Sequence, residues 1–247
     1  MSNKDSKEYW EQKYATAEPR IAQKEDTVRL WIEQHFPPLA NNEKKSCIEI
    51  GCYPGQYLSV FGELGYELYG VDYCTKVDLM AASLRKAGYA IGQFWEDDFL
   101  SFDPQRKFDV VASFGFIEHF DNFGEVIEKH ISLMDDRGYL VIEVPNFIGA
   151  FQHWFHFNFD RSNYDRHFIP AMDIGKWVDI FEKRNLRIIY KGYFGRLGFW
   201  TEDKGRGPWQ DMFLRVSKGY VGPLLRMTLP KDKRLYSPYA GVIAQKQ

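Results

Sequence analysis

A glycine-containing turn and a later acidic residue have the spacing of a nucleotide site. The turn reads CIEIGCYPGQY, in which Gly51 and Gly55 follow a short apolar run. Asp72 lies 21 positions after Gly51, where a carboxylate ending a second strand can accept both hydroxyls of a ribose. The backbone amides of such a turn face a ligand beyond the carboxyl end of the strand. These residues predict a nucleotide-like cofactor.

The middle of the turn distinguishes between two kinds of cofactor. Tyr53 occupies the position where a dinucleotide fingerprint has its central glycine, and Pro54 follows it. A pyrophosphate needs a close backbone approach that this pair does not favour, so a nicotinamide-dependent oxidoreductase is disfavoured. Further along, WEDDF places Asp98 where it can accept from an adenine amino group and Phe99 where its ring can cover the base. Adenine and ribose without a pyrophosphate describe S-adenosylmethionine.

Alternating short apolar runs and helix-period segments between residues 46 and 145 predict the parallel sheet that positions these residues. The expected strands are SCIEI, ELYGV, YAIGQFW, FDVVAS and GYLVIEV. We expect a helix from Gly55 to Leu64, with Gly65 as a left-handed stop. Further helices are expected over KVDLMAASLRKAG and around Val126 and Ile127.

Beyond Pro145 two long segments interrupt this alternation. They are residues 146–169 and 195–235, both rich in aromatic residues, and we expect them to form cap insertions over an acceptor site. Between and after them come a helix over PAMDIGKWVDIFEKRN, a sixth strand LRIIYKGYF and a seventh strand PYAGVIAQK. Residues 1–45 are expected to hold N-terminal helices. The whole chain, 1–247, is interpreted as one domain.

The bulk composition limits the partners and the compartment. A net charge of −2 provides no global positive field for nucleic acid, so no nucleic-acid partner is expected. There is neither an apolar signal core nor an apolar run of about 18 residues, so we expect no membrane span and a cytoplasmic protein. Three cysteines without CxxC spacing are expected to be packed thiols. The oligomeric state is not predicted.

Six motifs in order resemble the class I S-adenosylmethionine-dependent methyltransferases over nearly the whole chain. They are EIGCYPG, GVDY, DDF, FDVVASFGFIEHF, RGYLVIEVPN and YDRHF. The branch with this likeness includes ubiquinone and menaquinone pathway enzymes and many small-molecule N- and O-methyltransferases. The resemblance implies a Rossmann-like α/β fold with a seven-stranded, mostly parallel sheet, whose antiparallel last strand lies between strands five and six. It also implies S-adenosylmethionine as cofactor and S-adenosylhomocysteine as product. Tyr53 departs from the family, which usually has a small residue there.

The resemblance implies eight cofactor-binding positions, which are Tyr14, Glu49, Gly51, Gly55, Asp72, Asp98, Phe99 and Phe114. Glu49 would orient the loop or the methionine amino group, and the two glycines would pass close to the methionine part. Phe114 would offer its backbone carbonyl to the methionine ammonium, and Tyr14 would close over the carboxylate. As alternatives, Asp98 is a solvated loop acid and Tyr14 a surface aromatic.

Two histidines are candidate catalytic bases. Methyl transfer from a sulfonium is an in-line displacement that an amine undergoes when neutral, whereas a hydroxyl usually needs a base. His119 in IEHF and His167 in YDRHF could accept such a proton, although His119 could equally make a structural hydrogen bond. Some relatives bind a divalent ion through a Glu-x-x-Glu-His cluster. Here Gly115 occupies its first position and leaves Glu118 and His119, so we predict no metal.

The acceptor is expected to be a polar small molecule. Arginines lie among the aromatic residues of the two insertions, and an arginine fork suits a phosphate or carboxylate. We expect Tyr164, Arg166 and Tyr193 to bind the substrate. A phosphorylated amino alcohol or a sugar of an envelope or capsule pathway fits this mixture better than a quinone tail. The alternatives are a non-catalytic S-adenosylmethionine-binding scaffold and, less favoured, an oxidoreductase. Methylation of nucleic-acid bases is disfavoured because SFGF replaces the Asn/Asp-Pro-Pro-aromatic motif.

Overall fold

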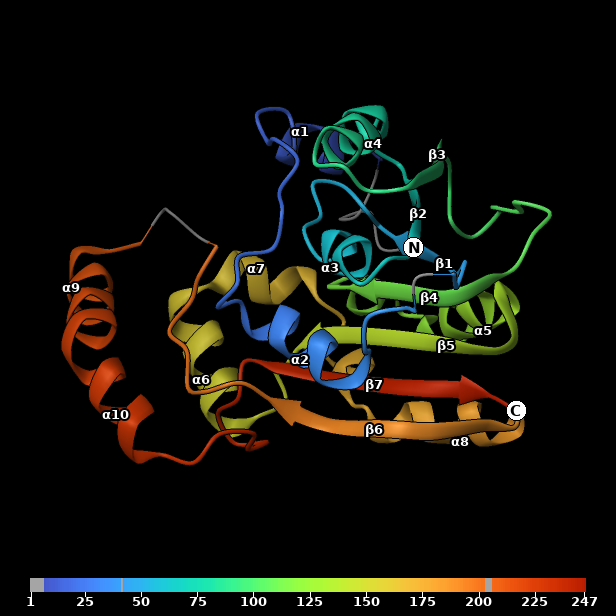
Figure 1. Ribbon diagram of the computed structural model, residues 1–247. Coiled ribbons are helices and arrows are strands. Elements are labelled where there is room, and N and C mark those ends of the chain that lie inside the picture. Colours follow the sequence, from blue (N-terminus) through green and yellow to red (C-terminus); the bar gives the residue numbers. More distant parts are fainter. Residues whose placement is uncertain (1–6, 41, 203–205) are drawn as a thin grey trace.

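A single seven-stranded sheet runs through the computed structural model, which describes residues 7–40, 42–202 and 206–247 (Figure 1). Its strands are β1 (Ser46–Ile50), β2 (Glu67–Asp72), β3 (Ile91–Glu96), β4 (Phe108–Phe114), β5 (Met134–Pro145), β6 (Leu186–Phe194) and β7 (Tyr239–Lys246). Their order is β3-β2-β1-β4-β5-β7-β6, and β7 runs antiparallel to both of its neighbours. The expected parallel sheet, with the seventh strand between the fifth and sixth, is confirmed.

The central strands show little alternation of apolar and polar residues, because both of their faces are covered. All five residues of β1 are buried, which explains the apolar run SCIEI. The fifth strand begins earlier than expected, at Met134 rather than Gly138. An irregularity in its pairing with β4 places three exposed polar residues, at positions 135–137, inside the strand, and these conceal its start from a pattern search.

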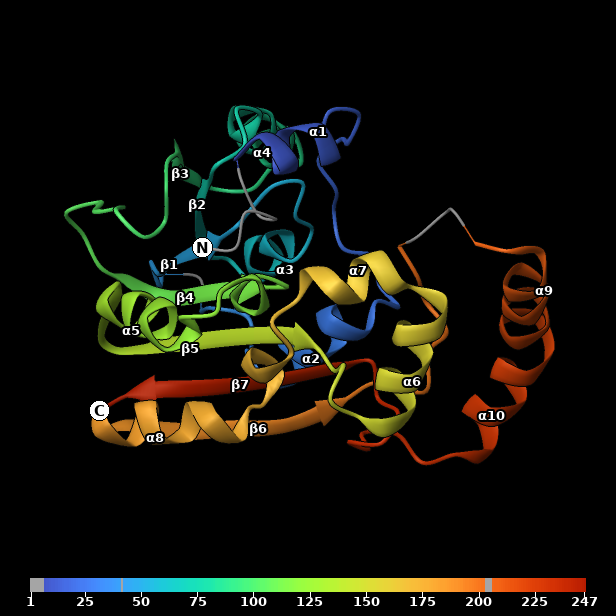
Figure 2. The ribbon, with the colours of Figure 1, turned by 180° about the vertical axis from the view of Figure 1, so that it is seen from behind.

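Helices cover both faces of the sheet (Figures 1 and 2). Helices α2 (Thr27–His35), α3 (Leu58–Glu63) and α4 (Val77–Lys86) pack in one core cluster, and α5 (Phe123–Ser132) and α8 (Gly175–Lys183) pack in another. Asp26 caps α2 by accepting from two backbone amides at its start. Gly65 ends the α3 region with a φ of +98°, as expected.

Cys47, Cys52 and Cys74 are buried free thiols, which confirms their expected packing role.

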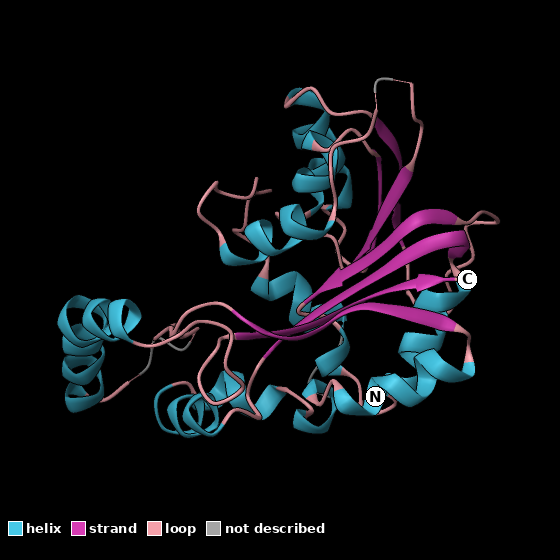
Figure 3. Ribbon diagram, turned by 60° about the horizontal axis from the view of Figure 1, so that its bottom comes forward, coloured by secondary structure: helices cyan, strands magenta, loops and turns pink. Residues whose placement is uncertain are grey.

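The two insertions are largely helical. Residues 146–169 contain α6 (Ala150–Phe159) and α7 (Arg161–Arg166), where the sequence showed no clean period. Helix α6 carries aromatic residues on most of its circumference, so its apolar positions do not form a stripe. The second insertion contains α9 (Pro208–Val216), a π-helical turn (Ser217–Val221) and α10 (Gly222–Thr228). Figures 1 to 3 show this last pair standing away from the sheet. Within the described ranges, no helix has the length and apolar character needed to cross a membrane.

Candidate cofactor and acceptor site

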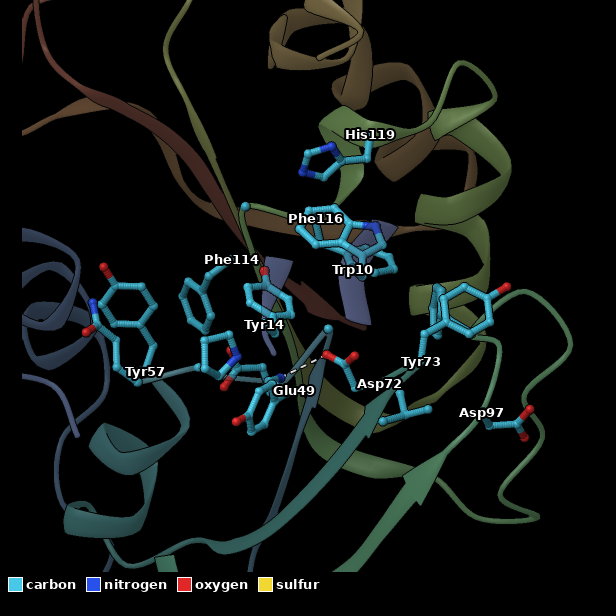
Figure 4. Close-up of a pocket in the computed structure, with 18 of the residues that line it drawn as sticks. Trp10, Tyr14, Glu49, Tyr57, Asp72, Tyr73, Asp97, Phe114, Phe116 and His119 are labelled. Carbon is cyan, nitrogen blue, oxygen red and sulfur yellow. Dashed lines mark hydrogen bonds between the residues drawn. The ribbon is translucent and has the colours of Figure 1, made fainter. Parts of the chain in front are cut away.

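A first pocket lies beyond the carboxyl ends of β1, β2 and β4 (Figure 4). Helix α1 (Lys7–Lys13) and the next residue, Tyr14, cover one side of this pocket. The lining includes all eight predicted cofactor positions: Tyr14, Glu49, Gly51, Gly55, Asp72, Asp98, Phe99 and Phe114. The carboxyl ends of neighbouring parallel strands meet at one edge of a sheet, so residues up to 100 positions apart converge here.

The two loop glycines have no room for a side chain. Gly51 has a φ of +72°, and a Cβ atom there would lie 2.6 Å from a ring carbon of Phe116. A Cβ atom on Gly55 would lie 2.5 Å from the backbone oxygen of Cys52. The pocket wall at this point is therefore bare backbone. Tyr53 also lines this pocket, and its buried side chain is held in place by its hydroxyl, which donates to the carbonyl of Ala17 at 2.5 Å.

Two buried carboxyl groups face the first pocket. Burial raises the pKa of Glu49 well above its usual range, and its Oε2 atom has no hydrogen-bond partner among the described residues. Burial also raises the pKa of Asp72, to about 6, against the opposing effect of two backbone amides. Those amides are Tyr53 N, 2.9 Å from Oδ2, and Cys74 N, 2.8 Å from Oδ1. Asp72 thus holds the glycine turn to β2 and keeps further lone pairs for a ligand.

Aromatic rings close the pocket, and several of them were missed by sequence reasoning. The predicted Phe99 is buried and its ring lies 5.6 Å from that of Phe116, which covers Gly51. Trp10, on α1, stacks on Tyr14, just after the end of that helix, with ring centroids 5.4 Å apart. Both side chains face the site. Their spacing of four residues, one helical turn, was the signal that could have identified Trp10. Tyr73 also lines the pocket, and its hydroxyl bonds to Asp98.

A second pocket shares a wall with the first. Six residues line both pockets: Trp10, Tyr14, Tyr57, Phe114, Gly115 and His119. The second pocket extends toward the insertions, which contribute Asn163, His167, Trp200 and Glu202. Molecules bound in the two pockets would therefore lie next to each other.

His119 and His167 meet in the second pocket, as their roles would require. Their ring centroids lie 4.8 Å apart, although 48 residues separate them in the chain. Asn163 O accepts from His167 Nδ1 at 2.6 Å, so the neutral ring has its lone pair on Nε2. Burial lowers the pKa of His167 to about 4 and that of His119 well below its usual range. Both rings are neutral at pH 7.

Glu118 joins the two histidines to form what we call the Glu–His cluster. One ligand atom from each of the three residues lies within 4.8 Å of the others, and His167 Nε2 lies 4.0 Å from Glu118 Oε1. The sequence had offered only two neighbouring ligands for a metal, and the fold adds His167 as a third. Two imidazoles and one carboxylate are a known ligand set for divalent transition metals. The prediction that this protein uses no metal remains a prediction.

Glu143 is a site residue that sequence reasoning missed. It lies near the end of β5, is 4% exposed and lines the second pocket, and its Oε1 atom has no hydrogen-bond partner within the part of the chain that is described. Burial first, and then the charge of Glu118, raise the pKa of Glu143 well above its usual range. The available signal was a lone acid in the apolar strand GYLVIEV, since a buried acid needs a partner or a purpose.

The three predicted substrate-binding residues are placed differently from one another. Arg166 lines neither pocket but pairs with Glu202, which lines the second pocket and whose Oε2 accepts from Arg166 Nη2 at 2.8 Å and from Lys13 Nζ at 3.0 Å. Tyr164 and Tyr193 line neither pocket. The hydroxyl of Tyr164 instead bonds with His153 on α6, because α7 turns that side chain toward α6. Tyr193, on β6, packs against the core beside Arg234.

Comparison with known protein families relates this geometry to a known class. The sequence profile of a family described as "methyltransferase domain" matches residues 21–191. A ubiquinone biosynthesis O-methyltransferase of Rhodopseudomonas palustris strain TIE-1 is 25% identical over 128 residues, which are 51% of this chain and 50% of that protein. The chain thus spans about half the length of the curated relatives it matches.

Solved structures share the fold. A methyltransferase dependent on S-adenosylmethionine from Archaeoglobus fulgidus is 20% identical with a TM-score of 0.54, over 98% of this chain and 100% of that chain. The magnesium protoporphyrin IX methyltransferase of Synechocystis PCC 6803, solved with S-adenosylhomocysteine bound, is 14% identical with a TM-score of 0.54. That match covers 89% of this chain and 80% of the other. At these identities the likeness concerns the fold.

Proposed function

The chain belongs to the methyltransferase domain family, and we propose that it methylates a nitrogen or oxygen atom of a polar small molecule. Its cofactor is S-adenosylmethionine and its product S-adenosylhomocysteine. The observation that carries the proposal is the pair of pockets with a common wall. The first pocket has the features of a cofactor site, and the second holds buried acids next to the first. A methyl donor and its acceptor need such contact, because the displacement is in line.

The residues of the first pocket fit the cofactor. Bound S-adenosylmethionine supplies an electrophilic methyl group on a sulfonium. The buried Oε2 atom of Glu49 is available to accept from its ammonium, next to the bare backbone of Gly51 and Gly55. Asp72 would accept from the ribose hydroxyls with the lone pairs that the loop amides leave free. Asp98 and Phe99 would hold the adenine, Phe114 would offer its carbonyl to the ammonium and Tyr14 would cover the carboxylate.

The second pocket supports an amino group as the acceptor. Glu118 and Glu143 are both at most 4% exposed there, and burying two like charges together is unfavourable unless a cation offsets them. An ammonium group would do so. Burial and the charge of Glu118 raise the pKa of Glu143, and an ammonium bound beside it would favour its ionised form, which could then take the proton and leave a neutral nitrogen lone pair. If the acceptor is a hydroxyl, His119 and His167 are the candidate bases.

The rim of the second pocket supports a polar acceptor. Lys13 and Arg166 share the single carboxylate of Glu202, so this group carries an excess positive charge beside the buried acids. A molecule with an amine at one end and a phosphate or carboxylate at the other, such as a phosphorylated amino alcohol, matches both charges. An amino sugar intermediate of an envelope or capsule pathway is a second form of the same chemistry.

We further propose that residues 1–45, 146–169 and 195–235 close this one domain over the acceptor. Trp10 and Lys13 from the first segment, His167 from the second and Trp200 from the third all line the second pocket. Excluding water from the junction of the pockets strengthens the electrostatic contacts at the transferring methyl group.

The test is a screen of simple amines, phosphorylated amino alcohols, nucleotide sugars and phenols, with release of S-adenosylhomocysteine as readout. We expect turnover with an amine. In the Glu143→Gln variant we expect kcat to fall by about 100- to 10,000-fold, the range of a lost general base, with unchanged cofactor affinity. Glu182→Gln, an exposed position on α8, is the matched control. Cofactor binding without turnover on any acceptor would favour the scaffold, and turnover on phenols alone would refute the amine.

A further inference from the structure

Helices α9 and α10 carry an apolar stripe on the outside of the protein. Together with the π-helical turn they form a nearly continuous helix, and we call residues 206–228 the arm. Large apolar side chains recur along it at intervals of three or four residues, which places them on one face. Their exposures are 61% for Trp209, 63% for Met212, 46% for Val216, 79% for Tyr220, 62% for Leu224 and 84% for Met227.

A different face of the arm packs against the protein, and at the start of the stripe the Trp209 ring also contacts Phe159, with ring centroids 5.5 Å apart. Leu214 is buried in a small core with Phe155 and Phe159 of α6, and the ring of Phe213 stacks on that of Phe159 at 4.5 Å. Phe199 packs against Gly222 at the start of α10. The apolar stripe is therefore a second apolar surface, separate from the one that the core uses. Solvent-exposed apolar surface of this extent marks an interaction site.

The arm is also a basic part of an acidic chain. It contains four Lys and Arg residues and one Asp residue, a net charge of +3 within a chain of −2. Arg206 pairs with Asp211. The other three cations, which form no ion pair with any described residue, are Arg215, Lys218 and Arg226. The net charge of the arm thus favours an anionic partner.

We propose that the arm binds an anionic lipid surface, with its apolar stripe in the interfacial layer and its cations against the head groups. An amphipathic helix with Lys and Arg beside Trp and Leu binds membranes in this manner, in the plane of the interface. A second copy of the chain is a poorer occupant of the stripe. Two-fold contact would bring two arms of charge +3 together, and like charges across an interface oppose association.

This surface has a consequence for the acceptor. Residues 197–202 join the base of the arm to the second pocket, since Phe199 contacts α10 and Trp200 lines the pocket. Figures 1 and 2 show the arm on the same side of the sheet edge as α6 and α7, which lie over that pocket. A docked arm would hold the second pocket near the lipid surface.

The test is cosedimentation of the full chain with vesicles of phosphatidylcholine alone and with vesicles of equal parts phosphatidylcholine and phosphatidylglycerol. We expect binding to the anionic vesicles, weakened by salt. The double variant Tyr220→Asp/Leu224→Asp should lower partitioning by at least about tenfold, and Arg215→Gln/Lys218→Gln by about fivefold for each charge removed. Leu79→Asp, on α4 and 48% exposed in the wild-type chain, is the matched control and should bind normally.

Thermal unfolding and S-adenosylmethionine affinity, measured on every variant, identify those that fail to fold. Equal binding to neutral vesicles, or no binding to either kind, would overturn the proposal. So would a concentration-dependent dimer that the Tyr220→Asp/Leu224→Asp variant loses, because a second copy would then cover the stripe. Since the readout is lipid binding, these results are independent of whether the proposed acceptor is correct.

Discussion

The Asp72→Asn variant tests the assignment of the first pocket most directly. The wild-type carboxylate accepts one backbone amide on each oxygen, at 2.9 Å and 2.8 Å, and a carboxylate has four acceptor positions in all. Two positions therefore remain for ribose hydroxyls. The variant keeps the size of the side chain but replaces an anionic acceptor with a neutral one that has a single oxygen.

The expected loss follows from the strength of hydrogen bonds to charged groups. Such bonds contribute about 1.5–3 kcal/mol, so at pH 7.5 we expect S-adenosylmethionine to bind about 10- to 150-fold more weakly. The pKa of Asp72 is raised to about 6, so the carboxylate loses its charge as the pH falls through that value. At pH 5 only about one tenth of the wild-type protein would keep the anion, and its advantage over the variant should shrink about tenfold.

The assay is isothermal titration of S-adenosylmethionine into both proteins between pH 5 and 7.5. The ratio of the two affinities reports the loss of the Asp72 charge, including its effect on Glu49, whose pKa that charge raises. Asp135→Asn, an exposed position on β5 away from the pocket, is the control. Equal affinities at pH 7.5, or a ratio that stays constant down to pH 5, would refute the ribose assignment.

Three further predictions concern the loop, the histidine and the metal. Gly51→Ala should abolish measurable cofactor binding, because the added Cβ would lie 2.6 Å from the Phe116 ring. Gly88→Ala, where φ is also positive at +92° but the surrounding space is open, should leave binding intact. Titration of the cofactor into both variants distinguishes these outcomes. His119→Ala should lower kcat more than cofactor affinity, and steady-state kinetics with titration showing equal losses would point to a structural role. Dialysis against a chelator should leave turnover unchanged, and activity that is lost and then restored by a divalent cation would assign the Glu–His cluster to a metal.

The cofactor half of the site could be predicted because it depends on chain order. Each of Glu49, Asp72, Asp98 and Phe114 lies at or just beyond the carboxyl end of a strand, and a parallel sheet brings those ends to one edge. The glycine turn could be predicted as well, since the φ of +72° at Gly51 and the close contacts of the turn are local features. Local spacing and sheet connectivity were sufficient for these residues.

The acceptor half could not be predicted in the same way. His167 lies beside His119 because the chain after α7 is held there, where Phe168 N donates to the carbonyl of Glu118 at 2.7 Å, and no periodicity encodes that contact. Glu143 lies near Glu118 because it is opposite Phe114 in the pairing of β4 and β5. Tyr164 was expected to bind substrate, yet it contacts His153, because the direction of a side chain on a short helix depends on its neighbours.

The sequence by itself determined the strands of the parallel sheet and the glycine turn with its acids, because these follow from local pattern, whereas the position of the seventh strand was implied by the family resemblance. Only the tertiary structure decided which buried acids and histidines face one another across the second pocket. It also decided that the apolar residues of α9 and α10 point outward, since the same spacing would serve a buried helix equally well. Long-range packing, which a one-dimensional pattern does not contain, is the physical reason in each case.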